Sequence, residues 1–113
     1  MSSPSLDEEL LTGYIDNLGS NIVKQMIELY VEQSNLYLVD IAKNVDENSQ
    51  SQWQESCHKM KGAAGSVGLK KVHALLVNIE KLTVSTEKKL LLLSELKQLN
   101  QSGITAFKQW LNA

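Results

Sequence analysis

The sequence predicts an all-α protein, specifically an antiparallel, up-down four-helix bundle with a short additional N-terminal helix. The only proline in the 113 residues is Pro4, and apolar residues recur at helical spacing almost everywhere after Leu6. The segments between the periodic stretches are short, which favours antiparallel packing of consecutive helices. At this length we expect one domain, residues 1–113, that buries a single core.

The first expected helix is short, covers residues 6–18 and lies across the bundle. Gly19 breaks this helix, and Ser20 is expected to cap the next one. The second expected helix, 21–44, has an apolar stripe that recurs at about 100° per residue and therefore faces the core. The stripe consists of Val23, Ile27, Tyr30, Ser34, Leu38, Ile41 and Val45.

The third expected helix covers residues 50–67. Ser49 and Ser51 each have a glutamine three positions further on, so either serine could close a capping box at its start. Gly68 follows the helix and predicts a left-handed C-terminal cap. The core-facing residues are Trp53, Met60, Ala64 and Val67, flanked by Cys57 and Ala63.

Two further helices are expected at 69–82 and 87–111, separated by a break in the pattern at 83–86. The apolar side of the fourth helix consists of Leu69, Val72, Leu76 and Ile79, with Leu75 beside them. The residues that fall on one line along the fifth helix are Leu92, Leu96, Leu99, Gly103, Ala106 and Trp110.

Composition and charge exclude several classes of function. All 11 basic residues are lysines and the net charge is -2, so we expect no nucleic-acid partner. The apolar runs are far shorter than the roughly 20 residues of a membrane span. Acidic residues stand near the N-terminus, where a signal peptide would be basic, so we expect a cytoplasmic protein without direct membrane contact. Cys57, the only cysteine, can form neither an internal disulfide nor a cysteine metal site. We also expect a monomer.

His58 lies opposite the core-facing side of the third helix and should therefore point into solvent. Gln54, Lys61, Gly62 and Gly65 share its face. A helical glycine costs about 1 kcal/mol relative to alanine, so the two glycines suggest either space that is kept clear beside His58 or close packing of a neighbouring helix. Lys61 offers a cation to an anion attached at His58. An exposed histidine is more often simply solvated, and geometry alone leaves both interpretations open.

The segment from His58 to Leu69 reads His-Lys-Met-Lys-Gly-Ala-Ala-Gly-Ser-Val-Gly-Leu. It resembles the phosphorylation motif of histidine-containing phosphotransfer (HPt) domains, approximately His-x-Leu/Met-Lys-Gly-x-Ala-x-x-x-Gly before a leucine-rich helix. The residues in register are His58, Met60, Lys61, Gly62, Ala64 and Gly68. Cys57 departs from the alanine common there, and outside residues 57–69 the likeness is one of helix pattern. The resemblance is particularly to the C-terminal HPt domains of Arc- and Tor-type hybrid sensor histidine kinases of bacteria.

This resemblance implies a phosphorelay intermediate of two-component signal transduction. His58 would accept a phosphoryl group from a receiver-domain aspartate and pass it to a response-regulator aspartate, with Lys61 as electrostatic support and Gly62 as clearance. The partners would be receiver domains of response regulators and of a hybrid histidine kinase, to which the chain could belong. The sequence has no nucleotide-binding glycine loop, so we expect no kinase activity of its own. We expect no cofactor, because the Mg²⁺ used in such transfers would sit on the receiver's carboxylates.

Glu80 is a candidate supporting residue at the edge of the fourth helix's apolar side. If the third and fourth helices are antiparallel around Gly68, His58 lies ten residues before that turn and Glu80 twelve after, so the two are level. Glu80 resembles a carboxylate or amide that some family members have at this position, which orients the histidine by accepting its Nδ1–H. The alternative is a solvated glutamate paired with Lys81 or Lys61.

A possible docking surface lies on the second helix, away from its core stripe, where Ile22, Leu29 and Leu36 recur every seven residues. Either the first helix covers these residues, or they dock a receiver domain together with Lys59.

Two other functions compete with phosphotransfer. A non-catalytic helical adaptor that binds a partner protein is the main alternative. A metal-carboxylate bundle is suggested by Glu55-x-x-His58, but it needs a second such motif. Lys70 stands three residues before His73, so the second motif is missing and no metal site is expected. His73 is expected to be a packed or half-exposed structural residue.

Overall fold

The computed structural model describes residues 4–113 and, within them, folds into α-helices joined by short connections. The all-α prediction is confirmed, and each helix lies within a few residues of its expected range. The helices are α1 (Glu8–Leu18), α2 (Ser20–Lys43), α3 (Gln50–Ser66), α4 (Lys70–Ile79) and α5 (Thr86–Leu111), with a 3-10 turn, η1 (Glu47–Ser49), before α3. Residues 1–3 of the expected domain lie outside the described part.

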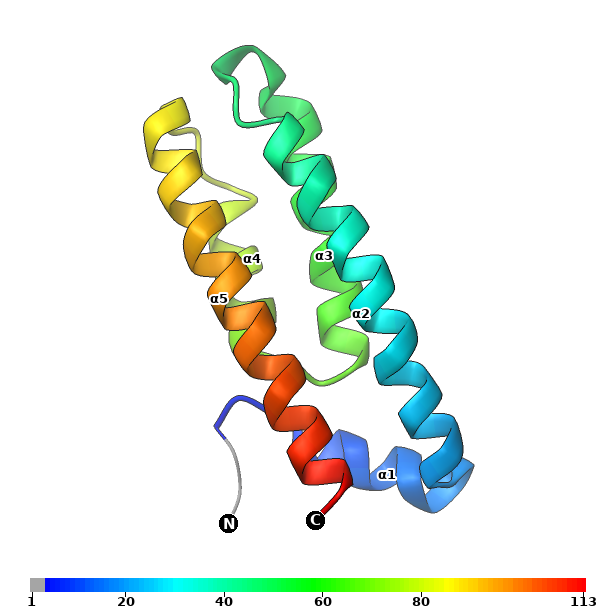
Figure 1. Cartoon of the computed structure of the whole chain (residues 1–113). Helices are drawn as coiled ribbons and strands as arrows, with labels where there is room; N and C mark the ends of the chain where they lie inside the picture. Colours follow the sequence, from blue (N-terminus) through cyan, green and yellow to red (C-terminus); the bar gives the residue numbers. More distant parts are fainter. Residues whose placement is uncertain (1–3) are drawn as a thin grey trace.

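The helices α2, α3, α4 and α5 lie side by side, and α1 crosses one end of them (Figure 1). Helix α3 packs between α2 and α4, and α5 packs against the other sides of α2 and α4. The molecule measures 45 × 23 × 17 Å, and its length follows from α5, which extends for about 39 Å at 1.5 Å per residue. No helix between residues 4 and 113 is long and apolar enough to cross a membrane.

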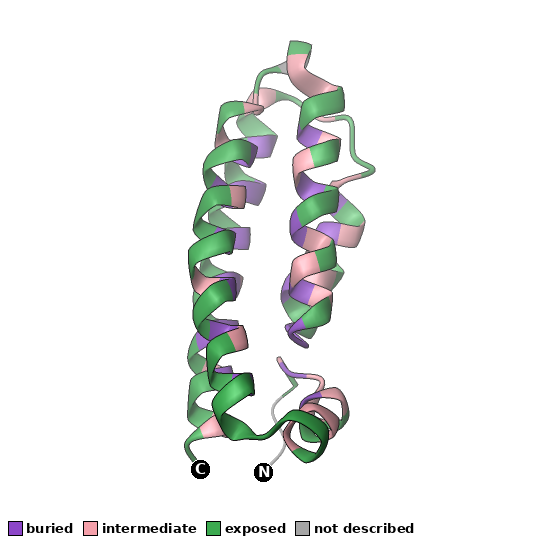
Figure 2. Cartoon of the chain, turned by 90° about the vertical axis from the view of Figure 1, so that its right-hand side faces the viewer, coloured by how far each residue is buried: buried purple, intermediate pink, exposed green. Residues whose placement is uncertain are grey.

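The core lies between the helices, and the buried positions of each helix face it (Figure 2). On α2 the expected stripe is buried from Val23 to Ile41, and Val45, which follows the helix, is partly buried. On α3 the core-facing side is also confirmed, with Trp53, Cys57, Met60 and Ala64 fully buried. The outward direction of His58 follows from this packing, because the opposite side of α3 is committed to the core.

The buried side of α5 is wider than the expected line and includes two polar residues. Leu99, Ala106 and Trp110 are only partly buried. The buried residues are Lys89, Leu92, Leu93, Leu96, Asn100, Gly103, Ile104 and Phe107.

The surroundings of the two buried polar residues differ: Asn100 is hydrogen-bonded, whereas the buried Lys89 ammonium has no hydrogen-bond partner among the described residues. The Tyr30 hydroxyl donates to Asn100 Oδ1 at 2.7 Å, and Asn100 Nδ2 donates to Ser34 Oγ at 3.1 Å. The Lys89 ammonium lies 5.1 Å from the centre of the Trp53 ring, within the range of a cation–π contact. The line of residues expected along the fifth helix included neither Lys89 nor Asn100, so the expected stripe was too narrow.

The turn between α3 and α4 has the predicted left-handed cap at Gly68, whose φ is 72°. Leu69 N–H donates to the Ala64 carbonyl at 3.0 Å, and Gly68 N–H donates to the Gly65 carbonyl at 3.2 Å. These two bonds form a Schellman motif, which satisfies the last carbonyl groups of α3.

The segment before α1 is attached to this turn. Asp7 N–H donates to the Gly68 carbonyl at 2.8 Å, and Lys70 N–H donates to the Ser5 carbonyl at 2.9 Å. Leu6 between them is buried and forms an isolated β-bridge with Leu69. The N-terminal segment therefore holds the α3–α4 connection from outside.

The starts of the first two helices differ from expectation. Helix α1 begins at Glu8, because the Asp7 side chain accepts the Leu10 N–H at 3.2 Å and so caps the helix there. Ser20 does not cap α2 but is its first residue, and Gly19, with a φ of 85°, takes the cap position without a side-chain bond.

The expected capping box at Ser49 or Ser51 is wrong. Ser49 precedes α3 without a side-chain cap hydrogen bond, and Ser51 lies inside the helix. Asp46 instead accepts the Asn48 N–H at 3.0 Å and caps the 3-10 turn that leads into α3. The chain thus enters α3 through a preceding turn, which supplies the start of the helix.

We predict that Gly68→Ala destabilises the protein by about 1 to 2 kcal/mol, because alanine disfavours a positive φ. The added Cβ would also lie 3.3 Å from Leu11 Cδ2. Gly13→Ala is the matched control, since a Cβ there meets nothing within 4 Å; it should be neutral or stabilise by up to about 1 kcal/mol. Urea unfolding followed by circular dichroism measures both, and equal effects would contradict the role of Gly68.

Candidate functional site

His58 projects from α3 into solvent, and 67% of its side chain is exposed. Its neighbours on the helix, Cys57 and Met60, are buried in the core. The imidazole is therefore accessible to another molecule while its backbone is fixed by a packed helix.

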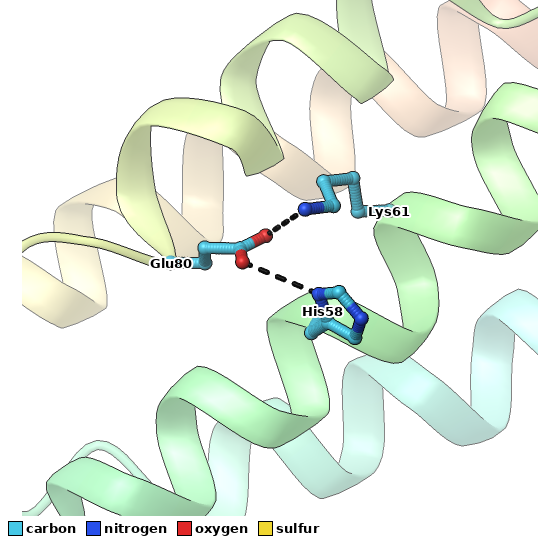
Figure 3. A network of polar contacts seen from close by, with 3 residues as sticks. All are labelled: His58, Lys61 and Glu80. Atoms are coloured by element: carbon cyan, nitrogen blue, oxygen red, sulfur yellow. Dashed lines mark hydrogen bonds and ion pairs between the residues drawn. The ribbon is translucent and has the colours of Figure 1, made fainter.

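Glu80 lies opposite His58, at the C-terminal end of α4 (Figure 3). Its Oε1 is 3.3 Å from His58 Nδ1, and only 16% of its side chain is exposed. The two residues are level, as expected from antiparallel helices around Gly68. Helix α4 ends at Ile79, earlier than the expected residue 82, so Glu80 caps the helix instead of lying within it.

Lys61 binds the same carboxylate. Its Nζ lies 2.8 Å from Glu80 Oε2, so one carboxylate joins two side chains of α3 through its two oxygens (Figure 3). The sequence left two interpretations of Glu80 open, one as an orienting group for His58 and one as an ion-pair partner of a lysine. In the structure the Glu80 carboxylate contacts both side chains, and the paired lysine is Lys61.

The charge state of Glu80 determines what His58 can do. The hydrogen bond from Lys61 lowers the pKa of Glu80, His58 lowers it further, and burial opposes both. An ionised carboxylate can only accept hydrogen bonds, so Nδ1 of a neutral His58 must carry the proton that points to Glu80. The other ring nitrogen, Nε2, is then unprotonated and points away from Glu80 (Figure 3). In that tautomer the nitrogen farther from Glu80 has a free lone pair.

The two glycines on this face have different surroundings. A Cβ at Gly62 would meet nothing within 4 Å, so the space beside His58 is open there. A Cβ at Gly65 would lie 3.1 Å from Cδ2 of His73 on α4. At Gly65 the structure therefore favours close helix packing over clearance beside His58, because the missing side chain makes room for His73. His73 is partly buried, as expected for a structural residue.

Gln54 and Lys59 stand apart from these contacts. Gln54 lies one turn before His58 and is partly exposed, but it makes no hydrogen bond to His58, Lys61 or Glu80. The Lys59 ammonium is 3.4 Å from the Glu55 carboxylate, in an exposed pair along the helix. No cluster of three or more potential metal ligands occurs among the described residues.

The apolar residues on the outer side of α2 are not covered by α1. Ile22, Leu29 and Leu36 are 43%, 54% and 66% exposed. Leu29 borders a shallow cavity of about 150 Å³ between α2 and α3, whose α3 wall includes Ala63. Ile22 and Leu36 do not line this cavity, and neither does His58.

Comparisons with known proteins agree with this description. The family model described as Hpt domain matches residues 25–112, which include His58, Lys61, Gly62 and Glu80. Among solved structures, the histidine-containing phosphotransfer domain of ArcB from Escherichia coli is similar, with a TM-score of 0.82 over 95% of this chain and 92% of that chain. The two sequences are 24% identical, and the likeness shows a shared fold. A search of curated proteins finds no match.

The lowered pKa of Glu80 predicts a pH-dependent contribution to stability. Because the folded-state pKa lies below the ordinary value of 4.5, this contribution is complete above that value and is lost as the pH falls through the folded-state pKa. The free energy of unfolding of the wild type should exceed that of Glu80→Gln by about 1 kcal/mol at neutral pH. This difference should shrink as the pH falls below 4.5. Urea unfolding across this range measures it. Lys61→Ala should reduce the pH dependence, and a pH-independent difference would contradict the assignment.

Proposed function

Because the chain belongs to the Hpt domain family, we propose that it is a phosphorelay intermediate whose phosphoacceptor is His58. In this proposal His58 accepts a phosphoryl group from a receiver-domain aspartate and transfers it to a response-regulator aspartate. The observation that carries the proposal is the contact of Nδ1 with Glu80 at 3.3 Å on an otherwise exposed imidazole. An exposed but solvated histidine would need no such partner.

The transfer uses the lone pair on Nε2 of His58. Nε2 attacks the phosphorus of the receiver's aspartyl phosphate, an N–P bond forms, and the P–O bond to the aspartate breaks, which leaves the carboxylate on the receiver. The proton on Nδ1 stays in place, and the positive charge that develops on the ring lies beside the Glu80 carboxylate. The second transfer reverses these changes toward another receiver aspartate.

Lys61 and Gly62 prepare the surroundings of the transferred group. The Lys61 ammonium lies one turn from His58 and is held by Glu80, so it places positive charge near an incoming anion. The open space at Gly62 lets the partner's backbone or the phosphoryl group approach the ring. Gly65 supports this face by allowing His73 of α4 to pack against α3, and Gln54 has no contact that assigns it a role in the transfer.

The proposal assigns the remaining chemistry to the partner. The Mg²⁺ that such transfers use would be held by the carboxylates of the receiver domain, and this domain would need no cofactor. A cytoplasmic location, a monomeric state and a place in a bacterial hybrid histidine kinase belong to the same proposal. So does the antiparallel up-down order of the four longer helices, which is supported between α3 and α4 by the pairs His58–Glu80 and Gly65–His73.

A receiver domain would dock on the apolar surface of α2 next to the site, formed by Ile22, Leu29 and Leu36, with Lys59 at its edge. The exposed pair that Lys59 makes with Glu55 is weak, about 0.3 to 0.5 kcal/mol for such a helix pair, and could be exchanged for a partner's carboxylate. The same exposed surface is compatible with a non-catalytic adaptor, which would bind a partner without being phosphorylated.

We predict that His58→Gln abolishes phosphorylation by a phosphorylated receiver domain and leaves the fold intact, because the side chain is exposed and outside the core. His73→Gln should retain transfer and is the matched control. Incorporation of labelled phosphate measures acceptance, and circular dichroism checks folding. Phosphorylation of the His58 variant at the wild-type level, or an unphosphorylated wild type, would overturn the proposal and favour the adaptor.

We predict that Gly62→Gln slows phosphotransfer at least about tenfold while stability is unchanged or slightly higher, since glutamine favours the helix and fills only open space. Lys61→Ala should also slow transfer, because it removes the cation beside the incoming anion. Gly13→Gln and Lys71→Ala, on α1 and α4, are controls outside the site. Rapid-quench measurement of the transfer rate decides, and wild-type rates in both site variants would show that this face is ordinary surface.

A further inference from the structure

A second concave surface lies between α2 and α5 and is separate from the site around His58. The cavity has a volume of about 760 Å³, and residues of α2 and α5 alone line it. Helices α3 and α4, which carry His58 and Glu80, contribute nothing to its walls. A molecule bound here would leave the phosphoacceptor accessible.

The groove is lined mainly by apolar side chains, together with three amides. The buried amide, Asn100, is already bonded at both ends, to Tyr30 and to Ser34. The other two, Asn35 and Gln101, are exposed and could bond to polar groups at the edge of a ligand. An apolar face would bury surface against the apolar side chains. The apolar lining residues are Val31, Leu38, Val39, Ala42 and Ile104.

The rim of the groove is positively charged. Lys43, Lys97 and Lys108 line it, no carboxylate does, and none of the three has an ion-pair partner among the described residues. Glu32 and Asp40 lie within or next to the same stretch of α2, and Glu95 lies just before Lys97 on α5, but none of the three lines the groove. Glu28 lines a separate small cavity, which Lys108 also borders. In a chain of net charge -2, the groove is thus a local concentration of positive charge that favours an anionic occupant.

The dimensions of the groove fit a helix. The lining residues extend along α2 from Val31 to Lys43, which is about 18 Å at the rise of an α-helix, or roughly three turns. The α5 wall, from Lys97 to Lys108, has nearly the same length. We propose that this groove binds an acidic amphipathic helix of a partner protein, with its apolar side on the floor and its carboxylates at the lysine rim. This proposal does not depend on phosphorylation of His58.

The probe is a designed helical peptide of about four turns with leucines on one face and glutamates at the flanks. It should shift the backbone amide NMR signals of residues 31–43 and 97–108 and leave those of 58–62 unchanged. A second peptide, with lysine in place of each glutamate, should bind at least about tenfold more weakly. No shift in the groove, equal affinity of the two peptides, or shifts centred on residues 58–62 would overturn the proposal.

Substitutions inside and outside the groove test where the peptide binds. Val39 lines the groove and is 51% exposed, so Val39→Asp should preserve the fold and weaken peptide binding at least about tenfold. Leu91→Asp is the matched control, because Leu91 is also exposed, at 62%, but lies outside the groove. Lys97→Glu should weaken binding of the acidic peptide and strengthen binding of the basic one. Equal effects of Val39→Asp and Leu91→Asp, or displacement of the peptide by vesicles of anionic phospholipid, would contradict a helix-binding groove.

Discussion

The site depends on the register of α3 against α4, because His58 and Glu80 come from different helices and meet at 3.3 Å only in one alignment. Gly68 sets that alignment by ending α3 in a left-handed conformation, and the N-terminal segment holds the turn through Asp7. The buried residues of both helices then prevent sliding, since a shift of one residue would turn apolar side chains into solvent. The geometry of an exposed imidazole is thus decided by a buried interface.

The Glu80 carboxylate links this helix register to the site, because it contacts both His58 and Lys61. Lys61 is the main cause of the lowered pKa of Glu80, and in the proposed function the ionised carboxylate accepts Nδ1–H of His58. In that proposal Lys61 also places its own charge near the ring. The groove between α2 and α5 lies elsewhere, so the bundle can offer one face for phosphotransfer and another for a helical partner.

Much of this arrangement could be predicted from sequence because it follows from periodicity within single helices. The outward direction of His58 and the cap at Gly68 are local properties. Contacts between helices are harder to predict from the sequence. The space at Gly65 was assigned to His58, whereas His73 of α4 fills it. The burial of Asn100 was missed for the same reason, since its partners lie on α2, 66 and 70 residues away in sequence. Such pairings depend on tertiary packing, which residue types on one helix do not encode.

Nitrogen-resolved NMR of His58, before and after phosphorylation by a receiver domain, tests the central claim most directly. The account predicts that neutral His58 carries its proton on Nδ1, that Glu80→Ala weakens this preference and slows transfer without abolishing it, and that the phosphoryl group is attached to Nε2. A dominant Nε2–H tautomer in the wild type, a tautomer ratio and rate unchanged in Glu80→Ala, or a phosphoryl group on Nδ1 would contradict it.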